Sequence, residues 1–506
     1  MSRTRDFRHR AARFAAGATL LGMLVAACSN SGPVTGTKGD ATANGPQSET
    51  AADTARSGDT VRIVVAYNDE TSDGNLITYT QSDRMVKSGA SMMGWSYSED
   101  GGQTWTYGGN VKPIKTFPIL WGDPAIATSK TDYSVMFMSS LAVTKARFPA
   151  SGVIDGGLGD YIGGACLAKS TNAGKTFAIY QCVSNTDALP DSPDGPKGHF
   201  YDGGSVVGSN TGEIFAAWVD VDTNQIDVYR APNASGTFKR IAAPFPGLSV
   251  GSHPRMRTGP DGSLYIAAQV GPSNNGAVFM NRLVNGAWGK PVQVSNASIY
   301  YPDIDFGTTV QGAELTLRAG NQFSFDVGAA SEDGNDAVRL LYVRQDANTQ
   351  QLFIAATACS ADLANCTDVP GWGTKGDKGP GGSLIDFYNP EVAAWRGFIG
   401  LPPTWQASWA YHYGKTATVN VSRLTLGYVN GTPLFIPVDI VKTTPVCSDA
   451  RTGGGYWGDY DSMIQVGFHN TSTVWMRFLS DSSQGCTKRW FFTSQNVHVQ
   501  EANYEY

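Results

Sequence analysis

The chain has 506 residues, of which 41% are hydrophobic, 11% aromatic and only 16% charged, and 59 are glycine. This composition excludes an intrinsically disordered chain, a coiled coil and a protein of long helices. A formal net charge of −6 at pH 7 excludes nucleic acid as a partner and attraction to anionic lipid. We expect an all-β protein with many tight turns, whose partners are neutral, cationic or a metal ion.

The first 27 residues carry the features of a secretory signal. Residues 1–13 hold five arginines, residues 14–25 are apolar, and small residues precede Cys28. A basic region, a short apolar region and small residues before a cleavage point direct export, and the apolar region is too short for a stable membrane anchor. The ending Val25-Ala26-Ala27-Cys28 resembles a bacterial lipobox. The resemblance implies that Cys28 begins the mature protein and carries the lipid.

A tether is expected to follow the lipid. Residues 28–58 are rich in Ser, Gly and Thr and hold almost no large apolar side chain, so they are expected to be disordered. Such a chain reaches roughly 30 Å. The folded domain is then expected over residues 59–506, on the outer side of a bacterial cell envelope, in contact with the membrane through the lipid only. By analogy with lipoproteins, Ser29 implies the outer membrane or the cell surface.

The remaining cysteines agree with export, where disulfides are stable. Cys166 and Cys182 lie symmetrically about Gly174, within a turn motif, and strands of a hairpin are close enough to be bridged. Cys359 and Cys366 likewise flank a short turn. These two pairings leave Cys447 and Cys486, which we expect to form the third disulfide; buried free thiols are the alternative.

One unit recurs through the body of the chain. A polar residue, often after an aromatic residue, opens a short strand, and a turn and a strongly apolar strand follow. Six such units are visible: 121–126 before 134–138, 200–203 before 213–218, 252–255 before 264–268, 324–327 before 338–343, 388–391 before 408–411, and 456–460 before 473–476. Four short strands per unit at this spacing predict the blades of a single β-propeller.

The number of blades depends on the chain ends. Residues 61–105 have no opening of this kind and resemble a blade that lacks its innermost strand. Residues 490–499 could supply the missing strand and close the ring. The sequence therefore favours seven blades, with six as the alternative.

A second repeated feature is a hairpin turn that ends in glycine and an aromatic residue. Residues 98–105 read Ser-Glu-Asp-Gly-Gly-Gln-Thr-Trp, and residues 170–177 read Ser-Thr-Asn-Ala-Gly-Lys-Thr-Phe. They resemble the Asp-box of the sialidase-like (BNR-repeat) superfamily of β-propellers, in which these turns lie on the blade periphery. The resemblance implies structural roles for Ser98, Asp100, Gly102, Trp105, Ser170, Asn172, Gly174 and Phe177.

The same resemblance allows a test for sialidase chemistry. Members that hydrolyse sialic acid are expected to hold three arginines that bind a carboxylate, the first of them in an Arg-Ile-Pro or Arg-Leu-Pro motif near the start. This chain has Arg62-Ile63-Val64 instead, inside an apolar strand. The departure argues against a sialidase.

The candidate site consists of the residues that open the repeated units. The inner strands of a propeller line its central channel, and their ends meet at one face. Carboxylates gathered there could bind a hard cation such as Ca²⁺ or act as the acid pair of a glycoside hydrolase; alternatively, each one hydrogen-bonds within its own turn. The candidates are Asp123, Asp202, His253, Arg255, Asp326, Glu391, Asp459, Tyr460 and Asp461.

Three functions remain open at this point. We expect a ligand-binding propeller, with a glycan as the ligand. A divergent glycoside hydrolase of the sialidase-like clan is the second hypothesis, and no enzyme signature in the sequence identifies its catalytic residues. The third hypothesis is a scaffold that binds another envelope protein.

Overall fold

The protein is described by a computed structural model. It covers residues 31–33, 47–69, 76–80, 83–151, 153–155, 161–184, 199–251, 253–272, 276–298, 303–310, 313–318, 323–328, 337–369, 373–378, 380–394, 405–413, 418–429, 432–439, 444–445, 455–456, 462–468, 472–481 and 496–505. Within these ranges the chain is built of β-strands, and no helix is long and apolar enough to cross a membrane.

The strands form antiparallel sheets, most of which follow one another along the chain. Sheet 1 holds β2 (Gln47–Ser57), β3 (Thr60–Asp69), β6 (Met93–Ser98) and β7 (Thr106–Asn110). Sheet 2 holds β8 (Ile119–Thr128), β9 (Met136–Val143), β11 (Ile162–Ser170) and β12 (Ala178–Val183). Sheet 3 holds β13 (Tyr201–Gly208), β14 (Ile214–Asp220), β15 (Gln225–Ala231) and β16 (Lys239–Arg240).

The remaining repeats of this pattern lie in the second half of the chain. Sheet 4 holds β17 (Arg255–Thr258), β18 (Leu264–Val270), β19 (Gly276–Val284), β20 (Ala287–Trp288) and β21 (Val292–Ser298). Sheet 5 holds β24 (Phe323–Val327), β25 (Val338–Gln345), β26 (Leu352–Cys359) and β27 (Cys366–Asp368). Sheet 6 holds β28 (Ile385–Ala394), β29 (Trp405–Tyr413), β30 (Thr418–Val429), β31 (Thr432–Asp439) and β32 (Thr444–Pro445). Sheet 7 holds β34 (Ser462–Phe468), β35 (Ser472–Asp481), β36 (Asn496–Glu505) and β1 (Ser31–Pro33).

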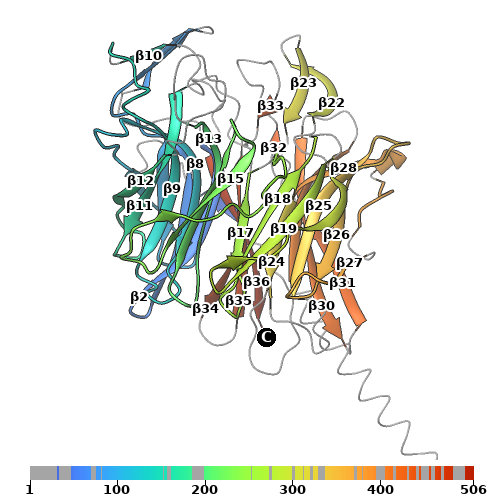
Figure 1. Ribbon diagram of the computed structural model, residues 1–506. Helices are drawn as coiled ribbons and strands as arrows, with labels where there is room; N and C mark the ends of the chain where they lie inside the picture. The colour runs from blue at the N-terminus through green and yellow to red at the C-terminus, as the bar shows by residue number, and fades with distance from the viewer. Residues whose placement is uncertain are drawn as a thin grey trace, which may run out of the picture.

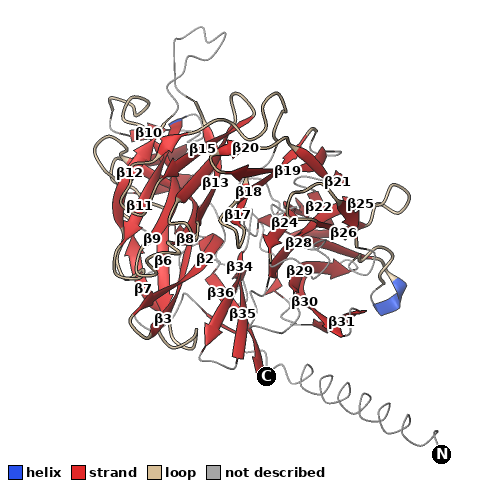
Figure 2. Cartoon of the chain, turned by 60° about the horizontal axis from the view of Figure 1, so that its bottom comes forward, coloured by secondary structure: helices blue, strands red, loops and turns tan. Residues whose placement is uncertain are grey.

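The first strands of these sheets lie around a common axis (Figure 2). Strand β2 contacts β8, β8 contacts β13, β13 contacts β17, β17 contacts β24 and β24 contacts β28, while β28 and β2 both contact β34. The arrangement is consistent with a β-propeller. The prediction of an all-β fold built from four-stranded antiparallel sheets is confirmed.

Two smaller sheets lie at one end of the molecule. One consists of β4 (Leu76–Thr80), β5 (Asp83–Lys87) and β10 (Val153–Asp155), and the other of β22 (Asp303–Val310), β23 (Ala313–Arg318) and β33 (Gly455–Tyr456). Both are at the top of Figure 1. Because β3 and β9 run toward these insertions and are antiparallel to β2 and β8, the first strands begin at this end. We call it the upper end.

The hydrophobic core lies between successive sheets. Successive side chains of a strand point to opposite faces, so Phe137 packs toward sheet 3 while Met136 and Met138 pack toward sheet 1. In β14, Trp218 faces sheet 2 and Val219 faces sheet 4. Burial on both faces explains why these strands read as continuous apolar runs rather than as an alternation.

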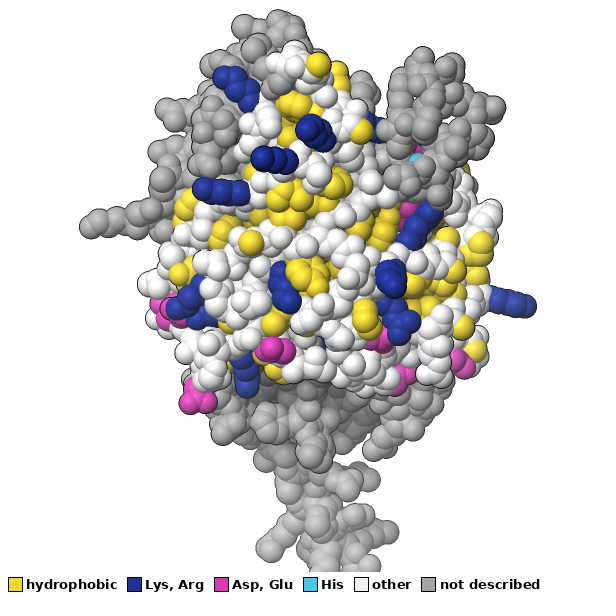
Figure 3. All heavy atoms as spheres, turned by 60° about the vertical axis from the view of Figure 1, so that its left-hand side comes forward, with side chains coloured by type: hydrophobic (Ala, Val, Ile, Leu, Met, Phe, Trp, Pro, Cys, Tyr) yellow, Lys and Arg dark blue, Asp and Glu magenta, His cyan; other side chains and the backbone are white. Residues whose placement is uncertain are grey.

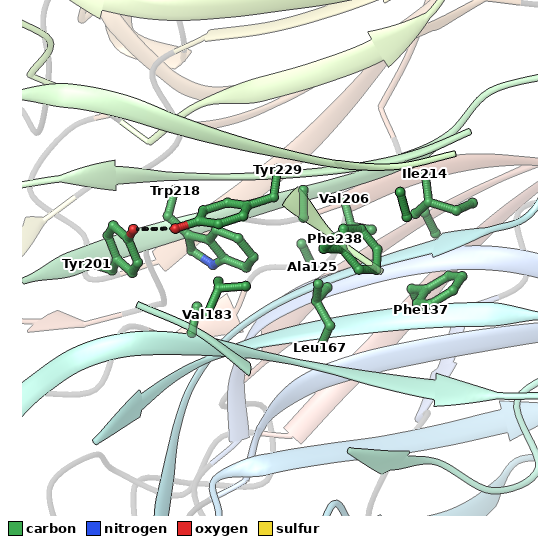
Figure 4. Packing of buried hydrophobic residues seen from close by; sticks show 14 of the residues in the cluster. Ala125, Phe137, Leu167, Val183, Tyr201, Val206, Ile214, Trp218, Tyr229 and Phe238 are labelled. Carbon is green, nitrogen blue, oxygen red and sulfur yellow. Dashed lines mark hydrogen bonds between the residues drawn. The ribbon is translucent and has the colours of Figure 1, made fainter. Parts of the chain in front are cut away.

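Figure 4 shows the interface between sheets 2 and 3. Tyr201 stacks on Trp218, with ring centroids 6.1 Å apart, and Trp218 meets Tyr229 edge to face. The two tyrosine hydroxyls lie 3.0 Å apart, and Tyr201 donates to Asp227 Oδ2 at 2.7 Å. The burial of these rings contributes about 1.5–3 kcal/mol per side chain, and the hydroxyl network satisfies the polar atoms that burial removes from water.

The turns that resemble Asp-boxes lie at the lower end, between the third and fourth strands of sheets 1 and 2. Thr104 N donates to Asp100 Oδ1 at 2.9 Å, and Thr176 N donates to Asn172 Oδ1 at 3.0 Å. Gly174 adopts a φ of 83°, and a Cβ there would lie 2.4 Å from Val64 Cγ2, so the position requires glycine. The carboxylate and amide thus close the turns on themselves, as local structure rather than as a ligand site.

A third turn of the same design was missed in the sequence. Ser360 Oγ donates to Asp362 Oδ1 at 2.5 Å, and Asp362 Oδ1 accepts from Ala364 N at 3.0 Å. The signal was the Ser-x-Asp spacing shared with residues 98–100, but the following glycines are absent. Leu363 adopts a φ of 62° in this turn instead.

Side chains of one sheet hold the outer turn of the next. Arg62 Nη1 in β3 donates to the carbonyl oxygens of Asn172 and Ala173 at 3.0 and 2.9 Å. Lys169 in β11 donates to the carbonyl of Ala234, and Tyr265 in β18 donates to that of Ala361, both at 2.6 Å. These cross-sheet hydrogen bonds fix the rotation of each sheet against its neighbour at the outer edge.

Two of the three expected disulfides are confirmed. Cys166 pairs with Cys182 across β11 and β12, and Cys359 pairs with Cys366 across β26 and β27. Cys447 and Cys486 lie outside the described residues, as do Cys28 and the signal region.

The expected boundary of the tether is wrong. Residues 47–57 form β2, which pairs with β3 from Gln47↔Asp69 to Ser57↔Thr60 and is the first strand of sheet 1. Strand β36 does not complete sheet 1, because it pairs with β35 and β1 in sheet 7. The folded domain therefore begins before residue 59.

Replacement of Arg62 should weaken the contact between sheets 1 and 2. Arg62 is 3% exposed and pairs with Glu99 in addition to the two carbonyls. We expect Arg62→Ala to lower the free energy of unfolding by about 2–3 kcal/mol, because charged hydrogen bonds are lost and two carbonyls are left without a donor. Urea denaturation would measure it. Lys175→Ala is the control, because Lys175 is an exposed partner of the same Glu99 and should cost at most about 1 kcal/mol. Equal effects of both changes would contradict the cross-sheet role.

Candidate functional site

Several first strands carry a β-bulge at their upper part. The pairing register shifts between Gly122 and Ala125, between Asp202 and Gly204, and between Tyr388 and Glu391. A residue with positive φ lies within each: Asp123 at 52°, Gly203 at 52° and Asn389 at 47°. Bulges redirect the side chains around them. The polar residues that open the repeated units therefore lie where the first strands change direction.

Three of the predicted residues come together at the upper end. Asp202 Oδ2 lies 3.4 Å from His253 Nε2, and the carboxyl of Asp123 hydrogen-bonds to Asp202. The residues come from β8, β13 and the segment before β17, that is, from three successive sheets. The side chain of Asp202 is 39% exposed and that of His253 17%, so a solute can reach both.

The backbone is shaped to allow this meeting. A Cβ on Gly203 would lie 2.2 Å from His253 Cγ, so the imidazole occupies the space that glycine leaves. Asn68, at the end of β3, accepts a hydrogen bond from Asp123 N at 2.8 Å. Gly122 permits this approach, because its Cβ would lie 2.2 Å from Asn68 Oδ1. Asp123 and His253 are thus positioned by neighbouring sheets.

The charge state of the cluster follows from its contacts. Burial raises the pKa of Asp202, but the charge and hydrogen bond of His253 and the hydrogen bond from Asp123 outweigh it and lower the pKa to about 2. The cluster therefore presents an ionised carboxylate at Asp202 with a second carboxyl group and an imidazole beside it.

Buried groups behind the strand hold Asp202 in place. Tyr201 precedes it and is fully buried in the interface of Figure 4, where Asp227 accepts its hydroxyl hydrogen. Asp227 also pairs with Arg240, with Oδ1 and Nη2 2.6 Å apart. Burial raises the pKa of Asp227 despite the hydrogen bond from Tyr201 and the charge of Arg240. The start of β13 is therefore anchored on the face opposite Asp202.

Arg255 and Glu391 form a second cluster across three sheets. Arg255 Nη2 lies 3.2 Å from Glu391 Oε1, and Ser324 Oγ donates to Glu391 Oε2 at 2.9 Å. Glu391 is 1% exposed, so its carboxylate is already fully committed to the protein. This cluster ties sheets 4, 5 and 6 together rather than offering a free carboxylate.

Asp326 does not join either cluster. Its carboxylate accepts from Ala394 N at 2.8 Å and lies 3.6 Å from Arg257 Nε. Ala394 is three residues beyond Glu391 in β28, which places Asp326 about 10 Å further along the axis. Residues at equivalent positions of the sequence repeat therefore lie at different levels along the axis.

The last three candidates, Asp459, Tyr460 and Asp461, lie outside the described residues. Among the described residues, no group of three or more His, Cys, Asp and Glu side chains could hold a metal ion.

Sequence reasoning missed the polar residues that support the site. Asn68, Ser324 and Arg257 each contact a predicted site residue; Ser324 opens the repeated unit 324–327 but was not predicted as a site residue, and Asn68 and Arg257 belong to no recognisable motif. Asn68 follows an apolar run at the end of β3, which is the only signal the sequence offered. Arg62, the residue compared with the sialidase arginine, instead holds an outer turn at the lower end.

Comparisons with known proteins give similarity in fold only. No protein-family model matches the chain, and no curated protein matches it in sequence. Among solved structures, it is similar to a leech intramolecular trans-sialidase complexed with 2,7-anhydro-Neu5Ac (12% identity, TM-score 0.42, 79% of this chain and 69% of that chain). It is also similar to an α-L-arabinanase of Penicillium chrysogenum (8% identity, TM-score 0.40, 93% and 98%) and to the polysaccharide lyase Uly1 (10% identity, TM-score 0.41, 93% and 92%). These values identify no substrate and no catalytic residue.

The depressed pKa of Asp202 predicts a pH dependence of stability. Because this pKa is lower in the folded protein than in the unfolded chain, its contribution is present above about pH 4 and is lost as the pH falls to about 2. Asp202→Asn should flatten the decline of the melting temperature between pH 4 and pH 2. His253→Ala should do the same, because it removes the charge that lowers the pKa. Thermal unfolding at several pH values measures the slope, and slopes equal to that of the unchanged protein would contradict the assignment.

Proposed function

We propose that the protein is a seven-bladed β-propeller, anchored by a lipid on Cys28 outside a bacterial membrane, that binds a glycan at one face of its central channel. The blade count is supported by the chain of contacts between first strands, which runs from β2 to β34 and back to β2. The hydrophobic cluster of Ile63, Val65 and Tyr67 in sheet 1 also packs against Ile464 of sheet 7.

The observation that carries the binding proposal is the cluster of Asp123, Asp202 and His253. Carboxylates accept hydrogen bonds from sugar hydroxyls, and an imidazole can donate or accept them. The three side chains come from neighbouring sheets, are partly exposed and lie where the first strands begin. Such convergence of polar groups is typical of a ligand site.

Binding without hydrolysis is favoured by the spacing of the carboxyl groups. Retaining glycosidases hold their two carboxyl groups about 5–5.5 Å apart and inverting ones about 6.5–9.5 Å apart. Asp123 and Asp202 are closer, since they hydrogen-bond directly. Glu391 is buried against Arg255 and Ser324, so it is not available as a second catalytic carboxylate.

One observation nevertheless favours a glycoside hydrolase as the second candidate. Two carboxyl groups beside an imidazole, with the pKa of Asp202 lowered, are the residue types that general acid and base catalysis uses. In this alternative Asp123 would protonate the leaving oxygen, and binding would have to separate the pair.

A protein scaffold has less support. Among the described residues, the large hydrophobic side chains that are exposed are Ile114, Tyr133, Val221 and Val284. Ile114, Tyr133 and Val221 lie in three different connections, and Val284 is the last residue of β19. Single exposed apolar residues of this kind are ordinary.

A glycan array tests the binding proposal. We expect the purified protein to bind selected glycans, and Asp202→Asn and His253→Ala to weaken that binding by about tenfold or more, because each loses a charged hydrogen bond to the ligand. Asp261→Asn is a matched control. Asp261 is also a paired carboxylate, with Arg282, but it lies in the lower turn between β17 and β18.

The outcomes separate the candidates. Binding that survives both upper-end substitutions would overturn the proposed site. Turnover of chromogenic glycosides that is lost in Asp123→Asn would replace binding with hydrolysis. Repeating the array with added Ca²⁺ and with a chelator tests whether a cation takes part, as the sequence-predicted group of carboxylates would allow. If the protein binds no glycan on the array but captures one envelope protein, the scaffold hypothesis is favoured.

The anchor has its own test. We expect metabolic labelling with a radioactive fatty acid to mark the protein in its bacterial host, and the label to be absent in Cys28→Ser, because the lipid is attached through the sulfur. The unlabelled variant should also leave the membrane fraction. A variant that keeps both label and location would contradict the lipobox assignment.

A further inference from the structure

A group of lysines stands at the upper end beside the proposed site. The four side chains are exposed. Lys112 and Lys115 belong to the connection between sheets 1 and 2, Lys145 follows β9, and Lys87 is the last residue of β5. Figure 3 looks at the side of the molecule where sheet 2 lies; in the upper left of its described surface, Lys and Arg stand among apolar atoms with no Asp or Glu between them. We call these four residues the lysine surface.

Backbone hydrogen bonds hold these loops together. Gly89 N, two residues beyond Lys87, donates to Pro118 O at 2.8 Å, and Lys145 N donates to Thr116 O at 2.8 Å. Ile114 and Phe117 exchange hydrogen bonds at 3.2 and 3.0 Å and close a tight turn around Lys115. The lysines are therefore carried by adjoining, hydrogen-bonded segments rather than scattered over the surface.

The positive charge of the lysine surface is not neutralised by the described part of the protein. None of the four ammonium groups forms an ion pair with a described carboxylate, whereas Lys130, Lys175 and Lys375 each do. The nearest acidic residue in the strand register is Asp155 of β10, which is paired with Met85 and not with Lys87. Like charges placed together repel within a screening length of about 8–10 Å, so an anionic partner would be bound favourably.

The location connects this surface to the proposed glycan site. Pro118 immediately precedes β8, and Asp123 lies five residues further along that strand, about 17 Å away. A polysaccharide that enters the upper end can reach both. Ile114, which is 39% exposed, adds an apolar surface next to Lys115 on which a sugar ring can pack.

We propose that the lysine surface binds the negatively charged part of a polysaccharide, so that the ligand class is an anionic glycan. The proposal rests on the proposed function and adds to it the charge of the ligand. It differs from what the net charge of −6 predicts, because a local group of cations, and not the total charge, meets a bound chain.

The test compares dextran sulfate with uncharged dextran of the same length. The variant Lys112→Glu/Lys115→Glu/Lys145→Glu reverses the surface. Lys239→Glu/Lys290→Glu/Lys378→Glu makes the same change of charge at exposed lysines elsewhere. We expect the unchanged protein to bind dextran sulfate more tightly than dextran, with affinity that falls as salt rises. The surface variant should lose about tenfold or more of that affinity, and the control variant less than twofold.

Several results would overturn the inference. Equal losses in both variants would mean that only total charge matters. Binding of phosphatidylglycerol vesicles, but not of dextran sulfate, through the same lysines would assign the surface to a membrane. If neutral glycans bind and only Asp202→Asn weakens them, the proposed function stands and the lysine surface has no part in it. If the lysine variant loses dextran sulfate while Asp202→Asn changes nothing, the lysine surface stands and the proposed site at Asp202 fails.

Discussion

The packing of successive sheets against one another, described from sheet 1 to sheet 5, is the interaction on which the rest of the structure depends. A four-stranded sheet with apolar side chains on both faces cannot be stable alone in water. Phe137 and Met138 are adjacent in β9 and are buried in different interfaces, one toward sheet 3 and one toward sheet 1. Because successive sheets are stacked in this way, the upper ends of their first strands lie next to one another.

The candidate site follows from this constraint together with local backbone geometry. Asp123 and Asp202 belong to different sheets, and only stacking makes them neighbours. The charge and the hydrogen bond of the His253 imidazole lower the pKa of Asp202 against the effect of its burial. That imidazole fits because Gly203 has no side chain. The position of the three side chains therefore depends on the stacking of the sheets and on the absence of side chains at Gly122 and Gly203.

The sequence predicted the strands that bury large side chains and failed where burial needs only small ones. Residues 47–57 were read as a tether because they hold no large apolar residue. As the first strand of sheet 1, β2 lies close to its neighbours, and there Thr50 and Ala55 are buried without being large. Its polar atoms are satisfied by sheet 2: Asp53 accepts from Thr128 N, and Thr128 donates to Thr54 O. The hydropathy of residues 47–57 cannot show that a neighbouring sheet supplies hydrogen-bond partners.

The sequence also did not show at which level along the axis a side chain lies, or toward which partner it points. Asp326 and Glu391 open equivalent repeats, yet one pairs with Arg257 and the other with Arg255, at different levels along the axis. The contacts of Arg62 could not be predicted from the sequence either. The sequence set Arg62 apart from the sialidase pattern but did not predict its contacts: its guanidinium donates to the carbonyl oxygens of Asn172 and Ala173 at the lower end. The contacts of a side chain depend on its strand, on the face of the sheet it occupies and on the end of the sheet at which it lies. The ligand of this protein therefore has to be inferred from the groups at its own upper end.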